Sequence, residues 1–167
     1  MRRSGVLLPV TSLPSRFGIG TFSKEAYAFV DFLKEAGQKL WQILPLGPTG
    51  YGDSPYQAFS TFAGNPYLID LEELIENGWL TEEECENTDW GGSKSYVDYE
   101  KMYQGRFPLL RKAYHNSHIA ENAEFIAFCE ENDWWLSDYA LFMAIKDSQG
   151  GASFLEWDAP LKLREPE

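Results

Sequence analysis

The sequence has few cysteines and no cluster of basic residues. Cys85 and Cys129 are isolated from each other and form no CxxC pair, so neither a disulfide framework nor a zinc knuckle is indicated. The net charge is −12. Nucleic acids and anionic membranes are bound through clustered Lys and Arg side chains, so this composition argues against both as partners.

Long apolar runs are also lacking. No stretch approaches the ~20 apolar residues of a membrane span. The early run GVLLPV is too short for a signal peptide and is interrupted by Pro9. We therefore expect a cytoplasmic protein.

Aromatic residues, by contrast, are abundant at 16% of the chain. Large rings fill protein cores, and they also bind flat, amphipathic ligands, because Tyr and Trp combine an apolar face with a polar tip. The stretch GPTGYGDSPYQAFSTFAGNPY, residues 47–67, concentrates glycine, proline and tyrosine around a single charged residue, Asp53.

The first part of the chain has the pattern of a strand, a helix and a second strand. Residues 5–10 and 39–46 are apolar runs typical of buried strands, and between them Ser23 caps a helix that Gly37 ends. Short connections of this kind predict parallel strands joined by a right-handed crossover. The loops that follow the two strands then emerge at the same sheet end, where α/β proteins bind ligands.

No third strand is indicated after residue 71. The sequence becomes acidic there, with a net charge of +1 over residues 1–71 and −13 over residues 72–167. Helices are predicted over residues 100–115, 120–131 and 134–148. Two parallel strands cannot form a viable sheet. We therefore predict the start of a larger α/β protein, and expect the isolated chain to expose apolar surface and to aggregate or be partly disordered.

The loop at 47–67 is the strongest candidate site. Its prolines and glycines fix tight turns that hold Tyr51, Asp53, Ser54 and Tyr56 in set directions. Rings that face the C–H surfaces of pyranoses, next to acids and hydroxyls, suit a sugar. The same residues also fit a stiff loop whose tyrosines pack only locally.

Other motifs give little indication of a functional site. Gly50 and Gly52 lack the third glycine and the Lys-Ser/Thr of a phosphate loop. His115 and His118 have no third ligand, which favours an exposed helix end over a metal site. No nucleophilic set or pair of catalytic carboxylates stands out.

Several segments closely resemble a known family. They are GVLLPVTSLPS, GIGTF, the block from FLKEAGQKLWQILPL through GNPYLIDLEEL, and DWWLSDYALFMAIK. Together they resemble the amino-terminal third of the 4-α-glucanotransferases, the amylomaltases or disproportionating enzymes of glycoside hydrolase family 77. The likeness covers essentially the whole chain.

This resemblance implies an α/β fold that is the start of a (β/α)8 (TIM) barrel. Residues 1–71 would supply the first two strands and the substrate loop, and residues 72–167 a mostly helical insertion. It implies transfer of α-1,4-glucan segments between maltooligosaccharides, or to glucose, with retention and without cofactor or metal. The family's catalytic carboxylates lie in later motifs that are absent here, so no catalytic residue is expected in this chain.

The resemblance implies substrate-binding roles for residues of this chain. Tyr56 matches the tyrosine that stacks on the sugar at the cleavage point, and Tyr51, Asp53 and Ser54 match the lining of neighbouring subsites. Tyr103 matches a tyrosine of an outlying glucan contact. Two other functions stay open: a non-catalytic α-glucan-binding module and a related α-glucan hydrolase.

Overall fold

The computed structural model describes residues 2–50, 52–93 and 95–165. The chain divides into two compact units, Met1–Ile119 and Ala120–Glu167. Because each unit packs within itself, the two are described separately.

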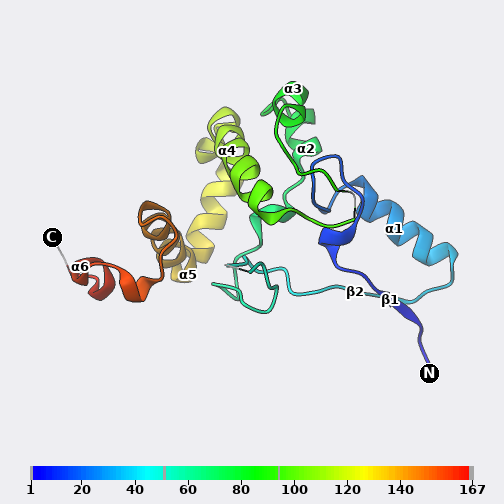
Figure 1. Cartoon of the computed structure of the whole chain (residues 1–167), viewed down its shortest axis with the longest axis horizontal. Helices are drawn as coiled ribbons and strands as arrows, with labels where there is room; N and C mark the ends of the chain where they lie inside the picture. The colour runs from blue at the N-terminus through cyan, green and yellow to red at the C-terminus, as the bar shows by residue number, and fades with distance from the viewer. Residues whose placement is uncertain (1, 51, 94, 166–167) are drawn as a thin grey trace. The chain divides into compact units, whose positions relative to one another are not determined.

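Two short parallel strands open the first unit. β1 (Gly5–Leu7) pairs with β2 (Leu40–Gln42), with Gly5 opposite Leu40. Helix α1 (Lys24–Glu35) connects the strands and lies alongside them (Figure 1). The predicted strand–helix–strand unit with parallel strands is confirmed.

Helix α1 begins and ends where the sequence predicts. The Ser23 hydroxyl accepts a hydrogen bond from the Glu25 amide at 3.3 Å, which satisfies one of the free donors of the first turn. Gly37 follows with φ of 72°, a conformation that glycine adopts without a steric penalty. On the inner face, the Phe29 ring meets the Trp41 ring of β2 edge-on, with centroids 5.0 Å apart.

The strands expose apolar side chains, as the lack of neighbouring strands predicts. Val6, Leu7 and Leu40 are 37%, 57% and 50% exposed, whereas apolar runs of this kind are typical of buried strands. The reason is that the sheet in the described part of the chain has two strands only, so most of the apolar surface of β1 and β2 has no neighbour to cover it.

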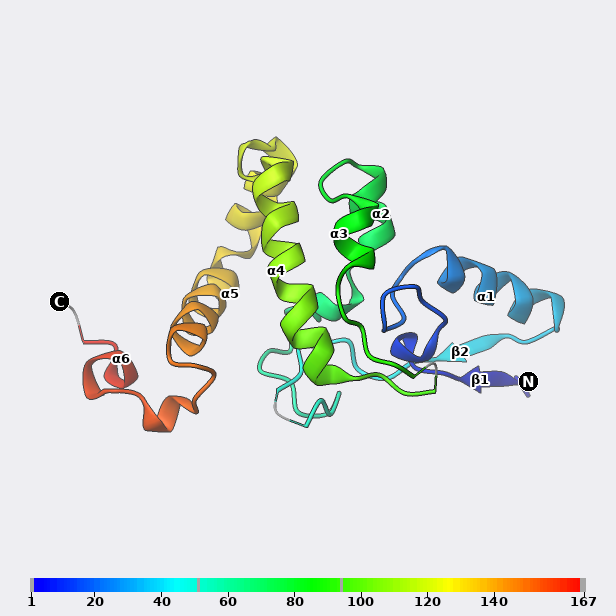
Figure 2. The ribbon, with the colours of Figure 1, turned by 45° about the horizontal axis from the view of Figure 1, so that its top comes forward.

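Three helices complete the first unit. α2 (Leu71–Glu76), α3 (Glu82–Glu86) and α4 (Tyr99–Ser117) lie side by side, with α4 beside the shorter pair (Figure 2). The predicted helix over 100–115 is confirmed as α4. The three helices share one core of buried side chains, contributed by Phe17, Leu71, Leu80, Cys85, Leu109 and Ala113.

The second unit contains α5 (Ala123–Ser148) and α6 (Ala159–Leu163). Its buried centre is Trp157, which is 6% exposed, packs near Phe142, and donates from Nε1 to the Ala152 carbonyl at 3.2 Å.

The prediction of separate helices over 120–131 and 134–148 is wrong, because α5 runs through both. Asn132 lies between the two predicted helices, and its side-chain amide donates to the Phe128 carbonyl one turn earlier, within the helix. No described helix is both long and apolar enough to cross a membrane.

Candidate functional site

The loop between β2 and α2 closes on itself. The Asn65 amide donates to the Leu46 carbonyl at 2.8 Å, which brings the two ends of the loop together. Further in, Thr49 and Ala58 form an isolated antiparallel bridge, and the Phe59 amide donates to the Pro48 carbonyl at 3.3 Å. The loop is therefore held by its own backbone.

Asp53 lies at the tip of this loop in a left-handed conformation. Its φ is 51°, and its amide donates to the Gly50 carbonyl at 3.0 Å. Aspartate tolerates this region better than most residues, because its short side chain can bond locally. Gly52 precedes it with φ of 89°, and no atom lies near enough to crowd an added side chain there. The turn is therefore set by backbone conformation.

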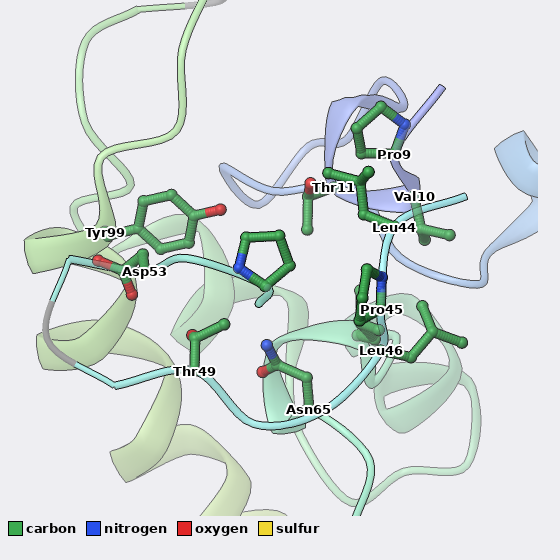
Figure 3. A pocket seen from close by; sticks show the side chains of 12 residues that line it. Pro9, Val10, Thr11, Leu44, Pro45, Leu46, Thr49, Asp53, Asn65 and Tyr99 are labelled. Carbon is green, nitrogen blue, oxygen red and sulfur yellow. The ribbon is translucent and has the colours of Figure 1, made fainter. Parts of the chain in front are cut away.

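A cavity of about 90 Å³ lies beneath the loop (Figure 3). Residues Pro9–Thr11 after β1 and Leu44–Leu46 after β2 line one side of it. The remaining lining comes from the loop, the segment after it and the start of α4, namely Thr49, Asp53, Pro55, Asn65, Leu68 and Tyr99. The cavity therefore sits at the carboxyl ends of both strands, as the strand–helix–strand pattern predicts.

The cavity combines apolar walls with hydroxyl groups and one acid. The Tyr99 hydroxyl is directed toward Thr11, and the Asp53 carboxylate lies beside the Tyr99 ring (Figure 3). Burial raises the pKa of the Asp53 carboxyl, and the nearby Thr49 hydroxyl partly opposes that rise. No Lys or Arg is among the described residues that line the cavity.

Two tyrosines near Asp53 are held firmly in the protonated state. Burial, with a contribution from the negative charge of Asp53, raises the pKa of Tyr67 to about 12. The same causes raise the pKa of Tyr99. Both hydroxyls are protonated at neutral pH, as an unperturbed tyrosine would also be. Because the described lining holds the Tyr99 hydroxyl and the Asp53 carboxylate but no Lys or Arg, the cavity suits an uncharged, hydroxyl-rich ligand better than an anion.

The predicted site residues fall into different places. Asp53 lines the cavity, whereas Ser54 lies beside it, where its hydroxyl accepts from the Tyr56 amide at 3.4 Å. Tyr56 is 73% exposed and Tyr103, on α4, is 56% exposed. Neither of these two is among the described residues that line the cavity. Tyr51 lies outside the described residues.

Sequence reasoning missed four polar residues of the cavity: Thr11, Thr49, Asn65 and Tyr99. A signal for Thr11 was available, because it directly follows the first predicted strand. The Asn65 side chain caps the turn that follows it by accepting from the Tyr67 amide at 2.9 Å. Tyr99 lies at the start of α4, far from the loop in sequence. Its place in the cavity depends on tertiary packing alone.

A metal centre is not indicated by the side chains. Among residues 2–50, 52–93 and 95–165, no three His, Cys, Asp or Glu side chains lie close enough together to hold a metal ion. Cys85 and Cys129 are both free thiols.

Comparison with known proteins identifies the family. Residues 8–167 match the sequence profile of glycoside hydrolase family 77, described as 4-alpha-glucanotransferase. The chain belongs to this family.

Individual relatives agree with the profile. The chain is 49% identical over 168 residues to a 4-alpha-glucanotransferase from Thermus thermophilus, and 48% identical over 158 residues to one from Clostridium butyricum. These matches cover 98% and 95% of the chain but only 33% and 32% of the two relatives. The chain therefore spans about a third of the length of the curated relatives it matches.

A solved structure is similar as well. An amylomaltase from Streptococcus agalactiae, solved in complex with acarbose, has a TM-score of 0.91 and 46% sequence identity. The match covers 99% of this chain and 34% of the amylomaltase. The chain is thus a helix-rich α/β structure with two parallel strands, and it resembles part of an amylomaltase.

Proposed function

We propose that the chain is the amino-terminal part of a 4-α-glucanotransferase that moves α-1,4-glucan segments between maltooligosaccharides, or onto glucose. The observation that carries this proposal is the family match over residues 8–167. The cavity, which is lined by hydroxyl groups and one acid and by no Lys or Arg among the described residues, supports a sugar ligand, as does the acarbose complex of the similar amylomaltase. A cytoplasmic location fits the two free cysteines.

In the complete enzyme, residues 1–71 would form the first βαβ part of a (β/α)8 barrel together with the substrate loop. Residues 72–167 would form a helical insertion. The uncovered apolar side chains of β1 and β2 support this assignment, because further parallel strands would bury them. This proposed boundary after residue 71 separates the barrel part from the insertion. It differs from the division after Ile119, which separates two compactly packed units.

The chemistry proposed for the enzyme is retaining transfer. A carboxylate attacks the anomeric carbon while a carboxylic acid protonates the leaving oxygen, and the two groups lie ~5–5.5 Å apart. The hydroxyl of an acceptor sugar then attacks the same anomeric carbon and displaces the carboxylate. Its proton passes to the conjugate base of the first step's acid, which restores the carboxylic acid. We assign both groups to parts of the enzyme beyond these 167 residues, and no metal or organic cofactor is required for either step.

The role proposed for this chain is to bind the glucan. Tyr56 stacks on the sugar at the cleavage point, and its exposure leaves the ring free to do so. Tyr51, Asp53 and Ser54 line neighbouring subsites. Tyr103 holds an outlying part of the glucan from α4, where its ring rests edge-on against Phe107 with centroids 5.2 Å apart.

Incubation with maltotriose tests the proposal. The full-length enzyme should release glucose and form longer maltodextrins, because one donor segment is transferred to another maltotriose. The isolated 167-residue chain should form neither, because it lacks both carboxylates. Chromatography of the products over time measures both.

Each contrary result has a definite meaning. Disproportionation by the isolated chain would place the catalytic groups within it and overturn their assignment elsewhere. Release of shorter sugars without longer ones would identify a hydrolase. A full-length protein that binds maltoheptaose in calorimetry but converts neither sugar would be a binding module.

A further inference from the structure

Arg106 on α4 is fully buried, at 0% exposed, and it is the one charged side chain of the buried set in the described residues. A buried guanidinium is unfavourable unless its charge is balanced and its donors are used. Burial lowers the pKa of Arg106 to about 10, so the side chain remains charged at neutral pH.

The contacts of Arg106 lie on the segment that ends the substrate loop. Its Nη2 donates to the Ile69 carbonyl. The Asp70 carboxylate is the foremost group that stabilises the positive charge. Nε and Nη1 have no hydrogen-bond partner among the described residues. The bond to Ile69 is thus the single direct hydrogen bond between this guanidinium and the rest of the described chain.

Asp70 is itself fixed from two sides. Its Oδ1 accepts from the Thr21 hydroxyl and from the Glu72 amide, each at 3.3 Å. The first bond ties it to the segment after β1, and the second caps α2. Arg106 therefore attaches α4 to a segment that is already anchored to the strand side of the unit.

The substrate loop and α4, the two elements proposed to bind glucan, meet near the bond from Arg106 to Ile69. The Tyr67 ring lies 5.9 Å from the Tyr99 ring and 5.7 Å from the Phe107 ring, both on α4. Phe107 in turn supports Tyr103. The loop that carries Tyr56 thus ends against the helix that carries Tyr103, and Arg106 bonds to the backbone just beyond that contact.

We propose that Arg106 is a positioning residue for long glucans. It touches no substrate, but it fixes the spacing between Tyr56 on the loop and Tyr103 on α4, so that one long chain contacts both at once. This inference rests on the proposed function. Two linked contacts strengthen binding only while their spacing matches the ligand, so the loss of Arg106 weakens the binding of long donors selectively. A short donor that occupies the loop alone is unaffected.

The test uses the full-length enzyme with maltotriose and maltoheptaose as donors. Arg106→Met removes the charge and the donor, whereas Arg106→Lys keeps a cation that can donate to the Ile69 carbonyl. Arg111→Met, at an exposed arginine of the same helix, is the matched control. Initial rates give KM and kcat for each donor, and thermal unfolding checks that each variant is folded.

Arg106→Met should raise KM for maltoheptaose by about tenfold and leave KM for maltotriose within about twofold. Values of kcat should change little for either donor. Arg106→Lys and Arg111→Met should resemble the wild type. A purely structural role would instead lower the amount of active enzyme or the unfolding temperature without changing the ratio of the two KM values.

A folded Arg106→Met enzyme with an unchanged KM ratio would overturn the inference and leave the proposed function intact. If Arg106→Met does not fold, Arg106→Gln takes its place, and the same separation of the two KM values is required of it. Wild-type enzyme that converts neither sugar would overturn the proposed function and this inference with it.

Discussion

Tyr56 and Tyr27 are exposed to nearly the same extent, 73% and 75%, but they lie in different settings. Tyr56 lies within a turn closed by the bond from the Gln57 amide to the Ser54 carbonyl at 3.0 Å, and Tyr27 lies on the outer face of α1. Solvent exposure alone therefore does not single out Tyr56 as the ring proposed to bind sugar. What differs is the position: Tyr56 directly follows Pro55, which lines the cavity, whereas no residue of α1 is among the described residues of that lining.

We predict that Tyr56→Ala in the full-length enzyme lowers the rate of maltotriose disproportionation at least about tenfold, since stacking of a ligand ring on an aromatic side chain contributes ~1–3 kcal/mol and also orients the reacting sugar. Tyr27→Ala is the control and should retain nearly full activity. Both variants should unfold within about 0.5 kcal/mol of the wild type, because neither ring is buried. Comparable activity of the two variants would remove Tyr56 from the site.

Asp53 shows how far residue-level reasoning from the sequence extends. The Gly- and Pro-rich spacing correctly predicts a tight turn around it, because proline fixes φ and glycine adopts the positive φ that such a turn uses. That its carboxylate faces Tyr99 could not be predicted. The two residues are far apart in sequence and meet only because α4 packs beside the loop.

At the scale of whole elements, α3 shows how a very short helix is stabilised. The Thr81 hydroxyl accepts from the Glu84 amide at 3.3 Å, and the Glu84 carboxylate accepts from the Thr81 amide at 3.0 Å. This reciprocal pair is a capping box. Lys112 of α4 also pairs with Glu84, which lowers the pKa of that carboxyl and links the two helices.

We predict that Thr81→Ala destabilises the folded enzyme by about 1 kcal/mol, because it leaves an amide of the first turn without its acceptor. Thr81→Ser keeps the hydroxyl and should cost less than half as much. Urea unfolding of the full-length protein measures both. If both variants were as stable as the wild type, the capping hydroxyl would contribute nothing, and burial of Cys85 together with the Lys112–Glu84 pair would suffice to hold α3.

The helices also show which elements a sequence can predict. The bounds of α1 follow from local signals, the Ser23 cap and the Gly37 stop, and both were predicted. In α5, Asn132 and Asp133 are weak helix formers where a break was predicted, but the helix continues. The Asp133 side chain accepts from the Ser137 hydroxyl one turn later, so these polar residues bond along the helix instead of ending it.

At the scale of the whole molecule, β1 and β2 present apolar side chains that this chain leaves uncovered. Leu7 and Leu40 are about half exposed, although their runs have the composition of strands that are buried on both faces. Truncation of one of these leucines to alanine therefore costs a different amount of stability on an exposed strand and in a closed barrel. On an exposed strand it changes stability by no more than about 0.5 kcal/mol, and in a closed barrel it leaves a cavity.

We predict that Leu7→Ala and Leu40→Ala each destabilise the full-length enzyme by about 2–5 kcal/mol, which is the range for leucine truncation in a packed core. Tyr27→Ala, on the outer face of α1, should again change little. The midpoint of urea unfolding, compared at a constant slope, measures all three. Costs near 0.5 kcal/mol at both leucines would mean that no further strands cover β1 and β2, and the barrel assignment would then be wrong even if the enzyme transfers glucans.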